Sequence, residues 1–466
     1  MEPKFTKSKS SSPKSPTSPL PREDFTEAVV DDPPKFDLES YLSNYEGRTR
    51  FTRLYFIGTR SSYLATEALK LALVEARSGK DVKNYQKALE ALVKVAPSET
   101  DTTLDKIWVE QTLKSVKADT DRLEHELKGY KNNLIKESIR MGNEDLGYHY
   151  HQIGDLSAAS KAYSRMRDYC TTTSHVASML FKNINVAVDR GDWLAVQSNV
   201  YRLRNLQFKP EDETKNKAKM WASLGLSQLA TGAYFDAAMS FVSTDPNLGD
   251  NYKEIISAND IAVYGGLCAM ASMDRSDLVS YVLENKSFRN FLELEPHIRR
   301  AVSYFCSSKF RPCLEILESY RGDYLLDIYL HNHVHHLYSQ IRTKAILQYI
   351  VPYNRIALRS MANVFSPKDI MTRTQRVTEI CSTFLLELLT LIQEGILDAQ
   401  VDLERDVLIS RQKTIRYGNH QAALDSLCDY MDTAHLHLVH LNILHAGLDV
   451  PDIQQCTSDS HFFNSR

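Results

Sequence analysis

Turn glycines that recur inside a helical apolar pattern constrain this 466-residue chain more than any other feature. In the stretch DLGYHYHQIGDLSAASKAYSRMRDYC, Asp145 to Cys170, small and large apolar residues follow helical spacing on both sides of Gly154. The arrangement returns in VAVDRGDWLAVQSNV and LGLSQLATGAYFDAAMSFV, with Gly191 and Gly232 in the turns. Gly191 follows Gly154 by 37 residues, and Gly232 follows Gly191 by 41. This periodicity predicts a stack of antiparallel helix pairs.

The spacing is that of an irregular tetratricopeptide-like repeat, since the regular repeat has about 34 residues. The small and large apolar positions that let two helices pack closely are Leu146, Gly147, Tyr150, Gly154, Ala159 and Tyr163 in the first hairpin and Leu224, Gly225, Gly232, Ala237 and Phe241 in the third. Weaker copies cover 267–283 and 304–317. We therefore predict a mostly α fold, with an N-terminal helical arm over 36–142 and a solenoid over 143–320 that winds as a right-handed superhelix.

His149 and His151 form an H-x-H pair just before the first turn, and imidazole pairs are common zinc ligands. On a helix, however, residues i and i+2 point about 200° apart around the axis, so the two rings cannot face one ion. We expect both histidines to have packing roles and Tyr150, between them, to face the core.

Both ends of the chain have the composition of disordered tails. Residues 1–35 are rich in Ser, Pro and Lys, with five basic side chains against one acidic in the first 22. Ser12, Ser15 and Ser18 each precede a proline, so phosphorylation could change the charge of this tail. A plain solvated extension is the alternative. Residues 448–466 form the second predicted tail.

The overall composition limits the function. A net charge of −3 and a pI near 6.6 argue against a chain-wide attraction to nucleic acid or membranes. The seven cysteines form no C-x-x-C pair, which is typical of a reducing compartment. The sequence shows neither the apolar core of a signal peptide nor the run of about 18 apolar residues of a membrane helix. We expect a protein of the nucleus and cytoplasm whose partners are proteins.

Residues 321–418 have the element order of a winged helix. IRTKAILQYIVPY and NRIALRSMANVF read as short helices, and STFLLELLTLIQEGI reads as a strongly apolar helix ending near Gly395. ILDAQVD and DVLISRQ then read as two strands joined by a turn at 403–406. Winged helices often bind DNA through the helix before the wing, so a DNA-binding regulator is the alternative to a protein-binding role.

The helix before the wing, Thr383 to Glu394, contains Glu387 and Glu394 and no Lys or Arg, whereas DNA binding depends on cations near phosphates. Its leucines cover more than one face, which favours packing on another subunit: Leu385, Leu386, Leu388, Leu389 and Leu391. We therefore predict a protein-binding winged helix.

A final helix over 419–447 carries an apolar seam with a 3–4 spacing across three heptads. The seam consists of Leu424, Leu427, Met431, Ala434, Leu438, Leu441 and His445. An isolated seam would leave leucines in water, so we expect it to pair with helices of other chains in a bundle. The alternative is that the helix folds back on its own domain.

The sequence contains no clear motif of catalytic chemistry. Asp327, His331 and His335 are spaced i, i+4, i+8 and could share a helical stripe with weak affinity for zinc or nickel, but no fixed fourth ligand is near. The H-x-H pairs at 149, 331, 333 and 435 lack the following proline and the Ser-x-x-Asp of zinc isopeptidases. The sequence has no P-loop, nucleophile elbow or dinucleotide fingerprint. We predict no catalytic, cofactor-binding or metal-binding residues.

A helical-repeat solenoid that runs into a winged helix and a bundle helix resembles the PCI-domain subunits of the proteasome lid, the COP-nine signalosome and translation initiation factor three. Three stretches are similar to the signalosome's subunit 1 family: YLSNYEGRTRFTRLYFI, EDLGYHYHQIGDLSAASKAYSRMRDYCTTTSH and QIRTKAILQYIVPY. Within the second stretch, RDYCTTTSH, residues 167–175, favours that family over its sister in the proteasome lid.

The resemblance implies a scaffold of the complex that removes the ubiquitin-like protein Nedd8 from cullin-RING ligases, with the zinc isopeptidase in another subunit. It implies contact with subunits 2 and 3 through a ring of winged helices, here through Leu385, Leu388, Leu389, Ile392, Ile396 and Val401. It also implies a shared bundle, here through Leu424, Leu427, Met431, Leu438 and Leu441. Contact with cullin-RING ligases would be indirect. A proteasome-lid or initiation-factor scaffold is the related alternative.

The chain departs from the family pattern at SPKDIMTRTQRVTEICST, Ser366 to Thr383, which is roughly a dozen residues longer than the family's connection. Two explanations stay open, an extra loop beside the ring contact and a translated intron.

Overall fold

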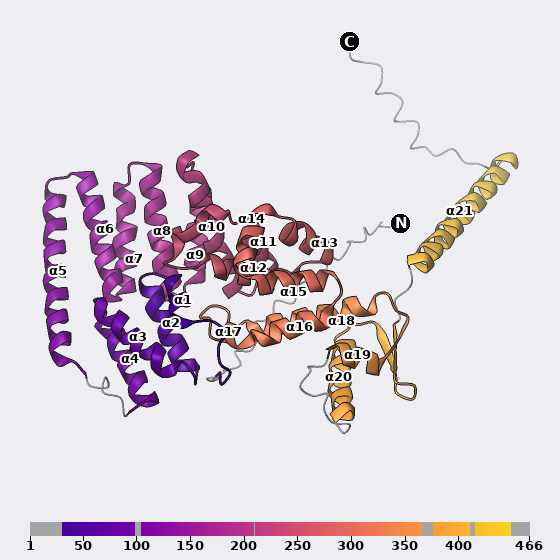
Figure 1. Ribbon diagram of the computed structural model, residues 1–466. Coiled ribbons are helices and arrows are strands. Elements are labelled where there is room, and N and C mark those ends of the chain that lie inside the picture. The colour runs from indigo at the N-terminus through magenta and orange to yellow at the C-terminus, as the bar shows by residue number, and fades with distance from the viewer. Residues whose placement is uncertain (1–29, 98–103, 209, 366–375, 411–414, 449–466) are drawn as a thin grey trace, which may run out of the picture. The chain divides into compact units, whose positions relative to one another are not determined.

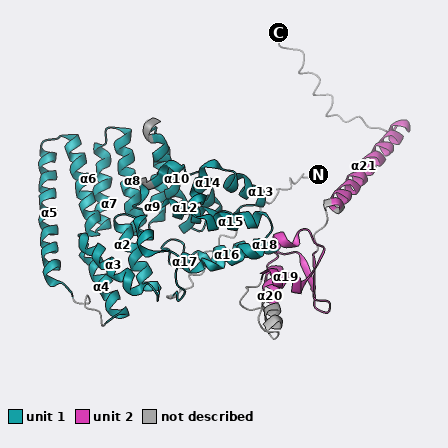
Figure 2. Cartoon of the chain, viewed as in Figure 1, with its two compact units in different colours: residues 1–346 teal, residues 347–466 magenta. Residues whose placement is uncertain are grey.

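A computed structural model describes residues 30–97, 104–208, 210–365, 376–410 and 415–448. The chain divides into two compact units, Met1–Ile346 and Leu347–Arg466 (Figures 1 and 2). The first unit is helical, apart from one isolated β-bridge among its described residues. The second combines helices with a small sheet. The predicted mostly α class is confirmed.

The N-terminal arm is a set of short helices: α1 (Leu38–Ser43), α2 (Arg48–Arg60), α3 (Ala65–Ser78) and α4 (Val82–Val95). Asp37 and Asp81 each cap a helix by accepting a hydrogen bond from the backbone N–H three residues later. The apolar faces meet in a core that includes Leu54, Ile57 and Leu69.

The second half of the predicted N-terminal arm is helical and is broken once. It forms α5 (Lys106–Asn132) and then α6 (Lys136–Ile153). Leu134 between them has a φ of +56°, a left-handed conformation that a helix cannot contain. The break lets the two helices pack side by side around Leu127, Ile139 and Leu146 (Figure 1).

The predicted hairpins follow along the solenoid. They comprise α6, α7 (Leu156–Arg165), the 3-10 turn η2 (Met166–Tyr169), α8 (Thr173–Arg190), α9 (Trp193–Arg204), α10 (Pro210–Ala230) and α11 (Tyr234–Val242). All three turn glycines are left-handed, with φ of +86° at Gly154, +70° at Gly191 and +79° at Gly232. Each ends a helix with the same pair of backbone hydrogen bonds, so the spacing found in the sequence reports a repeated C-cap.

Two further glycines let the hairpins close. An added Cβ at Gly147 would lie 2.5 Å from the Tyr163 ring, and one at Gly225 would lie 2.8 Å from the Phe241 ring. These contacts confirm the predicted pairing of small and large positions.

The rest of the first unit continues the stack. Its elements are η3 (Pro246–Tyr252), α12 (Ala258–Ser272), α13 (Arg275–Asp277), the π-helical turn η4 (Leu278–Leu283), α14 (Lys286–Leu294), α15 (Pro296–Cys306), α16 (Phe310–Ser319) and α17 (Arg321–Leu325), followed by α18 (Val334–Ile350), which runs into the second unit. α12 is buried on nearly all sides and forms the centre of this part of the stack.

The second unit has the winged-helix order. β1 (Arg355–Ala357), α19 (Leu358–Phe365), α20 (Arg376–Gln393), β2 (Ala399–Asp402) and β3 (Val407–Ser410) are followed by α21 (Ile415–His445). The two predicted wing strands are confirmed, and β3 lies between β1 and β2 in an antiparallel sheet. The prediction that residues 355–357 are helical was wrong, because Ile356 pairs with Leu408 as a strand.

The predicted N-terminal tail was drawn too long. Val30 is buried and exchanges backbone hydrogen bonds with Arg60 and Ser62, and the backbone N–H of Lys35 donates to Asp323. Residues 30–35 therefore pack on the first unit. Ser12, Ser15, Ser18 and residues 449–466 lie outside the described part of the chain, as do residues 366–375 of the extra segment.

Candidate interaction surfaces

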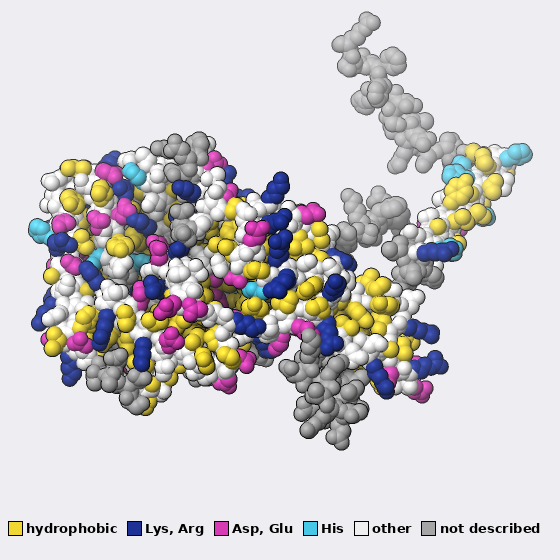
Figure 3. Space-filling view, in the orientation of Figure 1, with side chains coloured by type: hydrophobic (Ala, Val, Ile, Leu, Met, Phe, Trp, Pro, Cys, Tyr) yellow, Lys and Arg dark blue, Asp and Glu magenta, His cyan; other side chains and the backbone are white. Residues whose placement is uncertain are grey.

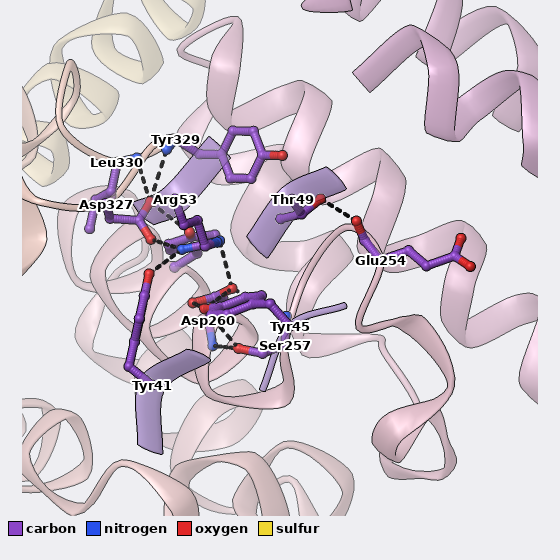
Figure 4. Close-up of polar contacts among 11 residues, drawn as sticks. Tyr41, Tyr45, Thr49, Arg53, Glu254, Ser257, Asp260, Asp327, Tyr329 and Leu330 are labelled. Carbon is purple, nitrogen blue, oxygen red and sulfur yellow. Dashed lines mark hydrogen bonds and ion pairs between the residues drawn. The ribbon is translucent and has the colours of Figure 1, made fainter. Parts of the chain in front are cut away.

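A buried arginine fastens the N-terminal arm to the far end of the solenoid. Arg53 of α2 is only 1% exposed, and its guanidinium lies between two carboxylates (Figure 4). Nη2 is 2.9 Å from Asp260 Oδ2, and Nη1 is 2.7 Å from Asp327 Oδ2. These partners are 207 and 274 residues away in the sequence. We call Arg53, Asp260 and Asp327 the clasp.

Tyrosines complete the clasp. Tyr45 Oη donates to both carboxylate oxygens of Asp260, at 2.7 and 2.8 Å, and Tyr264 Oη donates to Asp327 Oδ1 at 2.7 Å. The guanidinium also lies 4.0 Å from the centre of the Tyr45 ring, a cation–π contact.

The two carboxylates differ in pKa. Burial raises the pKa of Asp260, and the neighbouring carboxylate of Asp327 adds to this effect. Burial acts in the same direction on Asp327, but Arg53 and the hydrogen bond from Tyr264 hold its pKa below the ordinary value. The sequence signal for the clasp was weak, since nothing in the local pattern links α2 to residues so far away.

The helical stripe considered for Asp327, His331 and His335 does not form. Residues 326–333 form turns between α17 and α18 rather than one helix, so Asp327, His331 and His335 do not share a stripe. Asp327 instead accepts hydrogen bonds from the backbone N–H groups of Tyr329 and Leu330, and the His331 ring packs on Phe56. Among the described residues, no group of three or more His, Cys, Asp or Glu could hold a metal ion.

The H-x-H pair of α6 points in two directions, as expected. His149 Nε2 lies 2.9 Å from Thr120 Oγ1 of α5, whereas His151 Nε2 lies 2.6 Å from Asp189 Oδ2 of α8. Burial lowers the pKa of His149. Tyr150 packs on the α5–α6 core, and its hydroxyl donates to Glu124. His149 is more buried than Tyr150.

The predicted winged-helix contact residues fall into three groups. Leu388 is fully buried in the second unit, so it has no surface to offer a partner and is removed from the predicted set. Ile396 is 46% exposed. The remaining four, Leu385, Leu389, Ile392 and Val401, are partly buried. Leu386 on α20, which is not in the predicted set, is 61% exposed.

The predicted bundle residues are all exposed on α21. The exposed fractions are 45% for Leu424, 60% for Leu427 and Met431, 59% for Leu438 and 58% for Leu441. Every described side chain of α21 except that of Ala434 is exposed, and apolar atoms follow the helix in Figure 3.

The helix also exposes apolar side chains away from the seam, which the heptad analysis missed: Tyr430, Leu436, Val439, Ile443 and Leu444. A helix that is apolar on several faces is typical of the inside of a helical assembly. Among the described residues, no helix is both long enough and apolar enough to cross a membrane.

Comparisons with known proteins agree with this architecture. The family described as 26S proteasome subunit RPN7 matches residues 105–280, and the PCI domain family matches residues 317–412. The chain is 62% identical to COP9 signalosome complex subunit 1 of Emericella nidulans, over 90% of this chain and 84% of that protein. It is 40% identical to the protein of the same name from Neurospora crassa, over 87% and 89% of the two chains. Identity to the Arabidopsis thaliana protein is 36%, over 88% and 90%.

Proposed function

The chain belongs to the COP9 signalosome subunit 1 family, and from this membership we propose that it is a non-catalytic scaffold of a complex that removes Nedd8 from cullin-RING ubiquitin ligases. The isopeptidase would lie in another subunit. The complex would act in the nucleus and the cytoplasm.

The exposed apolar surface of α21 carries this proposal. Leu427, Met431 and Leu438 each expose more than half of their surface, although burying a leucine or methionine side chain is worth about 1.5–3 kcal/mol. A helix with this surface is stable in water only when other helices cover it. The partners would be the corresponding helices of other signalosome subunits.

The winged helix supplies a second contact. Among the described side chains of the α20 region, Leu386 and Ile396 are exposed and apolar, and they lie next to the partly buried Leu385 and Leu389. We propose that this surface contacts subunits 2 and 3 in a ring of winged helices. Contact with cullin-RING ligases would be indirect.

Purification of the tagged full-length chain from its own cells, with mass spectrometry of the captured proteins, tests the proposal. We expect the other signalosome subunits to be captured. The variant L427D/M431D/L438D places three charges in the seam and should lose most of them. The variant S426D/T433D/H440D places three on another face of α21 and should retain them.

A second pair of variants tests the winged helix. L386D changes an exposed side chain and should weaken capture of subunits 2 and 3 without unfolding the chain. L388D places a charge in the core and should unfold the second unit. Capture of proteasome-lid or initiation-factor subunits instead would assign the scaffold to a different complex.

A further inference from the structure

A cleft separates the N-terminal arm from the solenoid. Its volume is about 520 Å³, and it is lined by the turn before α2 and the first turns of that helix, by α3, α4, α6, α7 and α8, and by the segment before α12. Acidic side chains lie over α2 in the view of Figure 3. All the residues that line the cleft belong to the first unit.

Three carboxylates of this cleft, Glu46, Asp189 and Glu254, form no ion pair with a Lys or Arg of the described chain. Its two cationic side chains already have acidic partners. Arg48 Nη1 lies 2.8 Å from Asp81 Oδ2, and Lys182 pairs with Glu144, outside the cleft. The cleft therefore has a surplus of negative charge.

One buried acceptor in the cleft also lacks a hydrogen-bond donor. Asn185 Nδ2 donates to Glu254 Oε2 at 2.6 Å, but Asn185 Oδ1 is buried without a donor. A buried acceptor beside carboxylates that have no Lys or Arg partner favours a donor that carries positive charge, an ammonium or a guanidinium.

The chain itself contains a segment of the opposite charge. The first 22 residues hold Lys4, Lys7, Lys9, Lys14 and Arg22 against a single acidic residue, Glu2. The match of charge favours this segment over a neutral or acidic one.

The segment is also attached within reach of the cleft. The backbone N–H of Val30 donates to the carbonyl of Arg60 at 2.8 Å, which holds Val30 at the C-terminal end of α2. Glu46 of the cleft lies just before the N-terminal end of the same helix. The 13 residues of α2 span about 20 Å. The chain between Arg22 and Val30 can extend to about 28 Å.

We propose that the cleft binds the basic N-terminal segment of the same chain, residues 4–22, through its lysine and arginine side chains. Phosphorylation of Ser12, Ser15 and Ser18, each followed by proline, adds about −1.5 to −2 charges per site and releases the segment. The cleft then becomes free for a basic segment of another protein.

Carbodiimide cross-linking of the full-length chain tests this proposal, because it joins a lysine amine to a nearby carboxylate as an amide, while the carbodiimide takes up the water that is lost. At about 0.1 M ionic strength, the links from the tail lysines to the three cleft carboxylates should be at least fivefold more abundant than those to exposed control carboxylates. At about 1 M, where the Debye length is only 3 Å, this preference should disappear.

Two triple variants of equal charge separate a local site from the general charge of the protein. E46Q/D189N/E254Q should abolish the preferred links. E67Q/E90Q/E126Q, which changes exposed carboxylates on α3, α4 and α5, should leave them unchanged. S12D/S15D/S18D should reduce them at least threefold. Thermal unfolding of each variant confirms that the fold is intact.

Mixing isotope-labelled with unlabelled chain shows whether the link is intramolecular. The proposal is overturned if the tail lysines link equally to the control carboxylates, if no links form, or if the links join different molecules.

Discussion

Replacing Arg53 with methionine leaves Asp260 and Asp327 buried without their shared cation. Methionine keeps much of the side-chain volume, so the change removes charge and hydrogen bonds more than packing. Loss of one partner from a buried ion pair costs about 3–5 kcal/mol, because the remaining charge stays desolvated. The arm should therefore open more often from the far end of the solenoid.

Amide hydrogen exchange of α2 in the full-length chain measures this opening. A factor of ten in the opening equilibrium corresponds to about 1.4 kcal/mol, so exchange should become roughly 150- to 5,000-fold faster. The amides of α8 and α9 lie away from the clasp and provide an internal control.

The triple variant R53M/D260N/D327N tests the cause. Asparagine keeps an acceptor oxygen for Tyr45 and Tyr264 but removes both charges, so at least half of the lost protection should return. In R53M alone, burial should raise the pKa of both carboxylates above their unfolded values. The folded state then binds more protons than the unfolded state, so R53M should gain stability as the pH falls from 7 to 5. Equal protection in the single and triple variants would refute the reasoning.

Two further predictions concern packing and pH. Gly225→Ala places a Cβ 2.8 Å from Phe241 and should lower the free energy of unfolding by about 1–3 kcal/mol. Gly191→Ala meets no atom within 4 Å and should cost only about 1 kcal/mol of backbone strain, most of which Gly191→Asn should recover. Denaturant titrations of the three variants measure these differences. Burial lowers the pKa of His333 to about 4, so the folded state binds fewer protons than the unfolded state between pH 6.5 and 4. The free energy of unfolding should fall by about 2 kcal/mol from pH 7 to pH 5. Denaturant midpoints measure this fall, and a smaller fall in H333N would identify His333 as its source.

Local patterns in the sequence were enough to find the hairpins. Gly154, Gly191 and Gly232 occupy turns that need a left-handed residue, and Gly147 and Gly225 occupy positions where a ring packs on the backbone. Each requirement acts within about 20 residues, so composition and spacing report it directly.

Other features depend on contacts between distant segments. The clasp joins residues more than 200 positions apart, and the short strand β1 forms because β3, about 50 residues later, offers an edge. The i, i+4, i+8 spacing of Asp327, His331 and His335 does not form a helical stripe, because Asp327 is held in a turn by Arg53, Tyr264 and the backbone. Tertiary contacts of this kind leave no periodic signal in the sequence.

The central claim is that the chain supports assembly of a Nedd8-cleaving complex and does not itself cleave. The most direct measurement compares removal of Nedd8 from a neddylated cullin by three samples: the purified chain alone, the material captured on the tagged chain, and the material captured on L427D/M431D/L438D. We predict activity in the second sample only. Activity of the chain alone, or full activity on the seam variant, would contradict the account.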